Sequence, residues 1–467
     1  MKPSLNKLIA FLAGDVGSRA IGFVITAYLA RVLDTGGFGV VNIGFSVLGY
    51  LMLLGTPGIH LIETRNAAAA EGMHSERVQA ILSLRLVLAV ALILGAAVLA
   101  ALLPMEAGSR RVVVLSTFSL VPLALSLDWF FHGKEQFWVM SAAKVLSAAT
   151  FGTAGFIVVR SAEDVAWVPI AFALGNTAAA IFFLIQYRSQ FGPLRLMWRL
   201  PLWKQIVGSN VPVGMSVFLA QSTVNLPPIV VGWLVSSAAA GLFSAALKVV
   251  FVLLMIDRVV HALLLPVTSR AFTGRGENAA VLLVTVTKGI LVLLFPLTTC
   301  AVLLASPAVT LIFGEQYAAA APVLQILLAY FLLTVLNTVL VCALIGSGRE
   351  KAYTLAVTIG SALSVLASVF GTLLFGIGGT AWGMVAGELL TVVLMVRAVR
   401  RVVGGVIVRA LLAPSAAATA TTLGLVLMPA QHVAVQCVMA IVLFSVFAFV
   451  FRVLKKEERQ LLQGRFV

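Results

Sequence analysis

The chain has 467 residues, of which 61% are hydrophobic and only 10% are charged, and its formal net charge is +15. Soluble domains carry about 25% charged residues, so this composition excludes a water-soluble fold, and the mean hydropathy of +1.09 excludes a disordered chain. The basic residues lie in short segments between apolar runs rather than on one soluble face, which argues against nucleic-acid binding. The sequence therefore predicts an all-α integral membrane protein.

The apolar runs define the expected helices. A helix needs about 20 apolar residues to cross roughly 30 Å of hydrocarbon, and cutting the chain at its polar interruptions predicts about fourteen transmembrane helices. They cover residues 8–33, 40–61, 83–103, 112–131, 137–159, 165–187, 206–235, 241–266, 281–304, 322–344, 354–375, 379–399, 408–428 and 433–451. The N-terminal segment begins like a signal sequence, but Asp15 and Arg19 interrupt it and no small-residue cleavage site follows. We expect a retained first helix.

The basic residues also predict the orientation. With the N-terminus in the cytoplasm, the inside segments hold 22 Lys and Arg residues and the outside segments hold 4. Such a split is what the positive-inside rule produces, and it predicts a multi-pass protein with both termini in the cytoplasm. The seven tryptophans lie near predicted span ends, where their amphipathic rings prefer the headgroup region.

Charged residues remain inside the predicted spans. They are Asp15, Arg19, Arg85, Asp128, Lys144, Lys248, Asp257, Arg258, Lys288 and Glu388. A charge at the bilayer centre costs about 2.5 to 3.5 kcal/mol, so ten of them predict a polar lumen. Near cytoplasmic ends, Arg85, Asp128 and Lys288 are expected to snorkel or to have a structural role. Deeper charges are expected in the lumen, whereas Asp257 and Arg258, close to His261, fit either a lumen site or a local ion-pair network.

Two spans carry polar stripes at helical spacing. The first stripe comprises Asp15, Ser18, Arg19, Gly22 and Thr26, and the second, in the seventh span, comprises Asn210, Gly214, Gln221 and Asn225. Asp15 and Arg19 can pair because they are four residues apart. The seventh span also holds Pro212, Pro227 and Pro228, which permit the bending that a rocking transporter uses.

A weak internal repeat divides the chain. Gly39, after the first span, aligns with Gly241, after the seventh, at an offset of 202 residues that also places Arg19 opposite Gln221. Six spans separate the copies, which predicts two parallel six-helix bundles with the transport site between them. The expected parts are bundles at 1–190 and 206–401, a cytoplasmic linker at 191–205, and a C-terminal helix pair with a basic tail at 402–467.

Catalytic and cofactor motifs are absent from the sequence. There is no phosphate-binding loop and no zinc-protease motif, and the five histidines are scattered. Cys300, Cys342 and Cys437 lie in apolar runs without the spacing of a metal site or a disulfide framework, and are expected to be packing residues. The sequence predicts neither an enzyme nor a cofactor, and it predicts a helix connector at residues 346–348.

Several segments together resemble a known family. They are ARVLDTGGFGVVN, DWFFHGKEQF, SSAAAGLFSAALK, LPVTSRAF, LIFGEQYAAAAPVLQIL, ALIGSGREKAY and GIGGTAWGMVAGELL. In this order and spacing they are similar to the Wzx-type polysaccharide and O-antigen flippases of the multidrug/oligosaccharidyl-lipid/polysaccharide exporter superfamily. The resemblance implies a substrate on undecaprenyl pyrophosphate, flipped from the cytoplasmic to the periplasmic leaflet of a bacterial inner membrane for polysaccharide or O-antigen export.

The hypothesis assigns roles to the charges in the spans. Arg19, Lys144, Lys248 and Arg258 are candidate contacts of the pyrophosphate, because Arg and Lys replace lost hydration with charge-assisted hydrogen bonds. The other candidates are Asp15, Glu388 and Asp257 for a coupling H⁺ or Na⁺, and Asn210, Gln221 and Asn225 for the polar lumen. Further partners are membrane lipid and other polysaccharide assembly proteins. The alternatives are a cation-coupled drug antiporter of the same superfamily and a membrane-embedded glycan polymerase.

Overall fold

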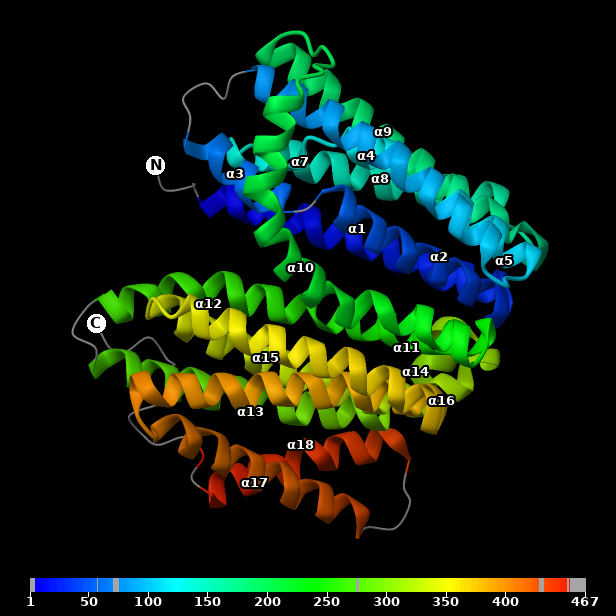
Figure 1. Ribbon diagram of the computed structural model, residues 1–467. Helices are drawn as coiled ribbons and strands as arrows, with labels where there is room; N and C mark the ends of the chain where they lie inside the picture. The colour runs from blue at the N-terminus through cyan, green and yellow to red at the C-terminus, as the bar shows by residue number, and fades with distance from the viewer. Residues whose placement is uncertain are drawn as a thin grey trace. The chain divides into compact units, whose positions relative to one another are not determined.

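The computed structural model describes residues 5–56, 58–69, 75–273, 277–427, 432–451 and 453, and this part of the chain is helical and contains no strand (Figure 1). The chain divides into two compact units, Met1–Ser244, here unit 1, and Ala245–Val467, here unit 2. The bundle and linker boundaries expected from the repeat stay predictions. Most of the expected basic tail lies outside the described residues.

Unit 1 contains ten α-helices in its described part, and an eleventh crosses its end. They are α1 (Leu5–Val32), α2 (Asp34–Gly55), α3 (Ile59–Ala69), α4 (Ser75–Leu102), α5 (Ala107–Thr117), α6 (Leu120–Ala124), α7 (Asp128–Gly133), α8 (Phe137–Val158), α9 (Trp167–Phe191), α10 (Leu200–Leu234) and α11 (Ser237–Leu253). A short 3₁₀ helix, η1 (Ala162–Ala166), precedes α9. The long helices α1, α8 and α9 pack side by side, and α2 packs against α5 and α10.

Unit 2 is built around α15, which packs against α12, α13 and α16. Its helices are α12 (Met255–Thr273), α13 (Glu277–Leu303), α14 (Ala305–Phe313), α15 (Ala321–Gly346), α16 (Glu350–Val403), α17 (Val406–Val426) and α18 (Val433–Val450), with the 3₁₀ helix η2 (Glu315–Ala320) before α15. The predicted connector at residues 346–348 is confirmed, because α15 ends at Gly346 and α16 begins at Glu350.

The predicted fourteen spans agree with these helices. Among the described residues, eleven helical segments are long and apolar enough to cross a membrane. One of them, α16, holds both the eleventh and the twelfth predicted spans. The first predicted span is α1, and the fourth is broken into α5, α6 and α7. Counting α16 twice and adding α1 and the broken span gives fourteen crossings, so the fold prediction is confirmed.

Small residues let the two arms of α16 pack closely. The helix turns back at Gly376, whose φ of +60° favours glycine. A Cβ added at Gly383 would lie 2.3 Å from the backbone nitrogen of Ser368, and one at Gly371 would lie 2.3 Å from the carbonyl oxygen of Gly379. Contact of this kind between backbones stabilises helix pairs in lipid, where apolar burial gives no driving force.

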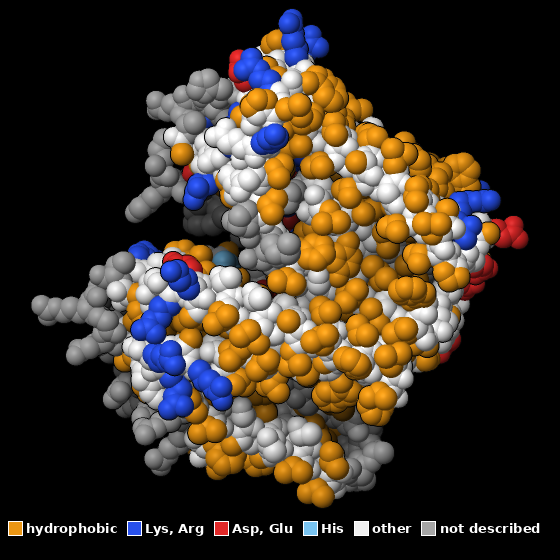
Figure 2. Space-filling view, in the orientation of Figure 1, with side chains coloured by type: hydrophobic (Ala, Val, Ile, Leu, Met, Phe, Trp, Pro, Cys, Tyr) orange, Lys and Arg blue, Asp and Glu red, His pale blue; other side chains and the backbone are white. Residues whose placement is uncertain are grey.

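The exposed surface carries more large apolar side chains than the surface of a water-soluble protein. In Figure 2 hydrophobic side chains are spread over the visible face of each unit, and in unit 2 the Lys and Arg side chains gather at one end of the helices. Leu374 and Phe375 in α16 are 73% and 75% exposed, and Phe449 in α18 is 72% exposed. An apolar belt with basic residues at its edge is typical of a protein surrounded by lipid.

The predicted repeat is visible as a reciprocal contact within unit 1. A Cβ on Gly39 would lie 1.8 Å from the carbonyl oxygen of Ser237, and a Cβ on Gly241 would lie 2.0 Å from the carbonyl oxygen of Thr35. Both Thr35 with Ser237 and Gly39 with Gly241 are 202 residues apart, the offset found in the sequence. The two copies of the motif therefore pack on each other through equivalent atoms.

Replacing Gly383 by valine is expected to destabilise the α16 hairpin by about 1 to 3 kcal/mol or more, because the new side chain meets backbone that cannot rotate away. Thermal unfolding of the detergent-purified protein measures the effect. The matched control is Gly378→Ala in the same helix, where an added Cβ meets no atom within 4 Å. Equal melting temperatures for the two variants would contradict the tight backbone packing.

Candidate functional site

An acid shared by two bases lies between α1 and α8. Asp15 accepts a hydrogen bond from Nε of Arg19 at 2.8 Å and another from Nζ of Lys144 at 2.6 Å. The helices approach closely here, since a Cβ on Gly14 would lie 2.4 Å from Cβ of Ser141. Arg19 and Lys144 remain 37% and 40% exposed. One carboxylate balances only one of the two cations, so this cluster carries a net positive charge that a ligand can reach.

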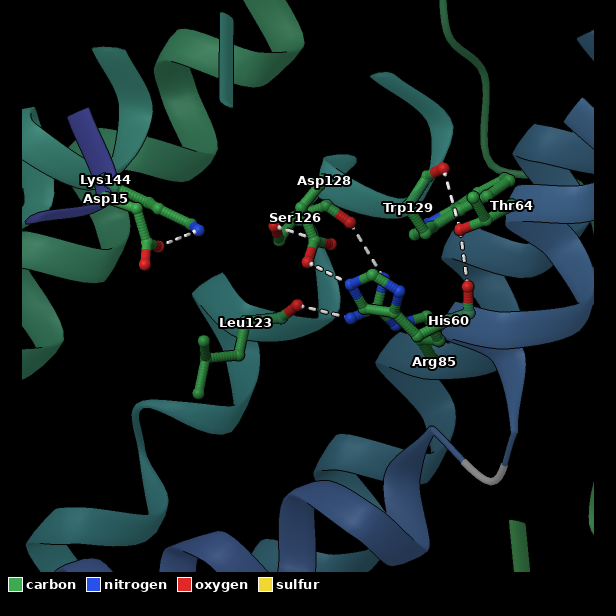
Figure 3. Close-up of polar contacts among 9 residues, drawn as sticks. All are labelled: Asp15, His60, Thr64, Arg85, Leu123, Ser126, Asp128, Trp129 and Lys144. Atoms are coloured by element: carbon green, nitrogen blue, oxygen red, sulfur yellow. Dashed lines mark hydrogen bonds and ion pairs between the residues drawn. The ribbon is translucent and has the colours of Figure 1, made fainter. Parts of the chain in front are cut away.

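Arg85 of α4 supports the break between α6 and α7 (Figure 3). Its guanidinium donates to the carbonyl oxygens of Ser126 at 2.8 Å and Leu123 at 2.7 Å, and the residue is only 4% exposed. A helix broken inside a membrane leaves carbonyl groups that need donors, and a positive charge favours a helix C-terminus. Arg85 therefore does not snorkel to water, and the structural role is the one the geometry favours.

A histidine and a half-buried carboxylate face each other beside Arg85. Nε2 of His60, in α3, lies 3.0 Å from Oδ2 of Asp128, the first residue of α7. The hydroxyl of Ser126 donates to Oδ1 of the same carboxylate at 3.2 Å. The ring of His132 is 6.1 Å from the ring of His60, and His132 interacts electrostatically with Lys144 as well. In Figure 3 the side chain of Lys144, a member of the positive cluster between α1 and α8, extends toward the side on which this pair lies.

Aromatic packing fixes the position of α7. Trp129 and Phe131 are almost fully buried, and Phe131 stacks on Phe183 of α9 with ring centroids 5.7 Å apart. Phe130 contacts Tyr187, also in α9, at 5.1 Å. These anchors in the segment DWFF hold Asp128 and His132 at opposite ends of the short helix.

Glu63 forms a second ion-paired network in unit 1. Its carboxylate is fully buried and accepts hydrogen bonds from Arg77 at 2.7 and 2.9 Å and from Asn66 and Asn210 at 3.2 Å. Burial raises the pKa of this carboxyl group, but the hydrogen bonds from Arg77, Asn66 and Asn210 outweigh burial and bring the pKa below its ordinary value. Glu63 is therefore charged at neutral pH and ties α3 to α4 and α10.

The polar residues predicted on α10 lie in different surroundings. Asn210 is fully buried and bonded to Glu63. Asn225 packs against Gly49 of α2, where an added Cβ would lie 3.0 Å from its side-chain oxygen. Gln221 is exposed, and no hydrogen bond joins it to a described residue. The structure brings none of the three into contact with the cluster at Asp15, and their role in a lumen stays a prediction.

Unit 2 holds the two predicted acids, which are close enough to interact electrostatically. Asp257 accepts a hydrogen bond from Oγ1 of Thr338, and Glu388 accepts one from Nδ2 of Asn337 at 2.8 Å. The side-chain oxygen of Asn337 is buried and has no hydrogen-bond partner among the described residues. Each of the two carboxylates is thus bound by a neutral side chain.

The three basic residues predicted within the spans of unit 2 differ in exposure. Lys288 is 8% exposed, and its burial favours a structural position over the snorkelling one. Lys248 is partly buried, and no hydrogen bond or ion pair joins it to the described part of the chain. Arg258 is exposed. The predicted role of Lys248 and Arg258 in anion binding is not tested by their positions.

The sequence did not point to the network at Glu63 or to His60. Glu63 and Arg77 are separated by 14 residues that include undescribed positions, and neither lies in a predicted span. His60 lies at the end of one predicted span and Asp128 near the end of another. No periodicity in the sequence relates such positions. The packing of α3 against α7 reveals the pair at His60, and the contacts of Glu63 with Arg77 and Asn210 reveal the second network.

The fold is shared with solved membrane transporters. The chain aligns with lipid II flippase MurJ in an inward closed conformation at a TM-score of 0.77 and 12% identity, covering 95% of this chain and 98% of that one. An inward-facing multidrug resistance MATE family transporter of the MOP superfamily aligns at a TM-score of 0.56 and 14% identity, covering 85% and 94%. At these identities the likeness establishes the fold.

A third similar structure is a MOP superfamily transporter from Pyrococcus furiosus Vc1, described as having a binding pocket of reverse polarity that suggests a different function. It aligns at a TM-score of 0.56 and 13% identity, covering 86% of this chain and 96% of that one. No curated protein sequence gives a significant match.

The chain is thus a polytopic membrane protein with the fold of MurJ and of MATE transporters. The family model of the polysaccharide biosynthesis proteins matches residues 4–272, which is more than half of the chain. The chain belongs to this family.

Replacing Glu63 by glutamine is expected to lower the free energy of unfolding by about 3 kcal/mol at neutral pH, because Arg77 loses its buried counter-ion. The pKa of Glu63 is lowered on folding, so the wild-type advantage is complete at pH 7 and is lost as the pH falls below the ordinary glutamate range of about 4. Equilibrium unfolding in mixed detergent micelles at several pH values measures it.

The control for this variant is Glu76→Gln. Glu76 pairs with Arg199 at 3.3 Å, and both side chains are more than half exposed, so the loss of this pair is expected to change stability by less than about 1 kcal/mol. If both variants were equally stable, the buried network would not hold α3 and α10.

Proposed function

We propose that this protein flips a lipid-linked oligosaccharide, carried on undecaprenyl pyrophosphate, from the cytoplasmic to the periplasmic leaflet of a bacterial inner membrane by alternating access. The product is used for polysaccharide or O-antigen export. The glycan and lipid tail move together while the pyrophosphate is held by basic side chains. The proposed location has both chain termini in the cytoplasm, and other polysaccharide assembly proteins are the expected partners.

The observation that carries the proposal is the cluster in which Arg19 and Lys144 share the single carboxylate of Asp15. A pyrophosphate needs several hydrogen-bond donors and a net positive charge. Two cations that share one carboxylate can exchange it for a phosphate group. Both basic side chains are partly exposed, as a ligand contact requires. Membership of the polysaccharide biosynthesis family and the fold shared with a lipid II flippase support the same class of substrate.

The balance of charges within the spans supports an anionic substrate. Unit 1 holds Arg19, Arg85 and Lys144 against Asp15 and Asp128, and unit 2 holds Lys248, Arg258 and Lys288 against Asp257 and Glu388. Each unit therefore has three bases and two acids. Lys248 and Arg258 are proposed as the contacts from unit 2.

The acids of unit 2 are proposed to bind the ion whose gradient drives transport. Asp257 and Glu388 have neutral hydrogen-bond partners, so an arriving H⁺ or Na⁺ would relieve the repulsion between two carboxylates. Asp15 is the weaker candidate, because two cations already stabilise its charged form. Ion binding in unit 2 would then bias one conformation of the transporter.

The two alternative functions, a drug/cation antiporter and a glycan polymerase, require other features than those of this chain. A drug/cation antiporter of the same superfamily is expected to have an acidic excess in its lumen, whereas each unit here has a basic excess. A membrane-embedded glycan polymerase normally needs a large periplasmic loop with catalytic residues. The longest outside segment predicted here is the one that includes α14 and η2, where Glu315 is the ionisable residue.

Flipping is tested with the purified protein in vesicles that contain fluorescent undecaprenyl-pyrophosphate oligosaccharide. Wild-type protein is expected to move the label to the side protected from an external quencher. Arg19→Ala, Lys144→Ala and Lys248→Ala are expected to lower the rate at least tenfold, since loss of a charge-assisted hydrogen bond to phosphate costs about 1.5 to 3 kcal/mol.

The matched controls are Arg188→Ala in unit 1 and Arg400→Ala in unit 2, both exposed basic residues outside the cluster, which are expected to flip at the wild-type rate. Transport of a cationic drug with no movement of the labelled lipid would favour the antiporter. Full activity in all three cation variants, at wild-type protein level, would remove the assignment of these residues.

Neutralising the acids of unit 2 should separate coupling from substrate binding. Glu388→Gln and Asp257→Asn are expected to bind the lipid with unchanged affinity. The increase in flipping rate that an imposed ion gradient gives is expected to be at least tenfold smaller in these variants than in the wild type. The gradient is applied as H⁺ or Na⁺ in separate experiments, which identifies the ion. If the gradient increased the flipping rate of both variants as much as that of the wild type, Asp257 and Glu388 would not be the coupling site.

A further inference from the structure

A titratable pair in unit 1 has no role in the function proposed above. His60 and Asp128 contact each other at 3.0 Å, and the histidine side chain is 55% exposed while the carboxylate is 34% exposed (Figure 3). A histidine changes its charge near neutral pH, and a neighbouring carboxylate stabilises the protonated ring. His60 is therefore able to take up a proton at a place that small ions can reach.

The surroundings of the pair keep its charge from being cancelled. The groups that face it are Arg85 on α4, Asp128 and His132 on α7, and, beyond His132, Lys144 on α8. On α3 itself, Glu63 is bound to Arg77, and the α10 side chain bonded to this helix is the neutral Asn210. With His60 neutral, Arg85 and Asp128 balance each other. With His60 protonated, this group gains one positive charge.

Arg85 acts as the fixed member of the group. It is 4% exposed, its terminal nitrogens are bonded to two carbonyl groups, and its Nε has no partner in the described part of the chain. Because the guanidinium stays charged and cannot leave the break between α6 and α7, Asp128 stays ionised beside it. Only His60 and His132 can then change charge near neutral pH.

We propose that His60, held by Asp128, is a proton-binding site of unit 1, and that the bound proton strengthens the binding of a diphosphate anion at Arg19 and Lys144. The rings of His60 and His132 are 6.1 Å apart. In Figure 3 the Lys144 side chain extends from α8 toward the side on which Asp128 lies, so a charge added at His60 acts on the region where the anion would bind. Coupling of this kind is reciprocal: the anion also favours proton uptake. The identity of the anion rests on the proposed function, whereas the proton site rests on the pair alone.

The test measures the binding of geranylgeranyl pyrophosphate to the full-length protein in nanodiscs by calorimetry between pH 8 and pH 5.5. Relative to His60→Gln, the wild-type protein is expected to gain about tenfold in affinity over this range, the size expected for one added charge near a partly buried anion. The diphosphate itself takes up a proton near pH 6, so the difference between the proteins, not the absolute slope, isolates His60. At pH 8 the two should bind equally.

Two further measurements test whether His60 binds the proton. Calorimetry in buffers of different ionisation enthalpy should show greater proton uptake on binding for wild type than for His60→Gln, and the control His432→Gln, at the N-terminus of α18, should match wild type. An NMR titration of a protein in which the other four histidines are glutamine should show His60 titrating between pH 5 and 8, and Asp128→Asn should move its midpoint to lower pH.

The outcomes are distinct. A His60 resonance that does not titrate, or the same pH dependence in wild type and His60→Gln, would overturn the proton site. A titrating His60 with no diphosphate binding at any pH would support the proton site and remove the proposed substrate. If His60→Gln failed to fold, the titration of His60 and its shift in Asp128→Asn would decide the proton site.

Discussion

A charge or broken helix inside a bilayer must be satisfied by the protein, because no water is available there to do so. Arg85 shows the consequence. Its guanidinium bonds the carbonyl groups left at the end of α6, and this makes the break between α6 and α7 possible. The break in turn places Asp128 at the start of α7, opposite His60. Arg85, Asp128 and His60 therefore form one arrangement that depends on the broken helix, and are not separate charges.

The two units use the same balance of charge in different ways. In unit 1 a carboxylate is bound by two cations, which leaves basic groups able to exchange it for an anion. In unit 2 the carboxylates of Asp257 and Glu388 are bound by neutral side chains, which leaves acids able to accept a cation. Under the proposed function, such a division would separate substrate binding in unit 1 from ion binding in unit 2, and a transporter that links the two needs a conformational equilibrium that both ligands bias.

The internal repeat preserves packing more than chemistry. Gly39 and Gly241 pack reciprocally on backbone because any side chain would separate the helices at that point. At the same offset of 202 residues, however, Arg19 corresponds to Gln221 and His60 corresponds to Ala262. Backbone contact constrains both copies equally, whereas the ionisable residues belong to one copy each. The pair at His60 is thus specific to unit 1.

The sequence by itself determined the all-helical membrane fold, the fourteen crossings and the presence of charges within them, because these follow from local apolar length and composition. It also predicted that Asp15 and Arg19 can pair, since they are one helical turn apart. Only the tertiary structure decided that Lys144 joins them, that Arg85 supports a broken helix, and that Glu63 meets Arg77 and Asn210. These contacts join residues on different helices, and their partners depend on how the helices pack, which hydrophobic periodicity does not specify.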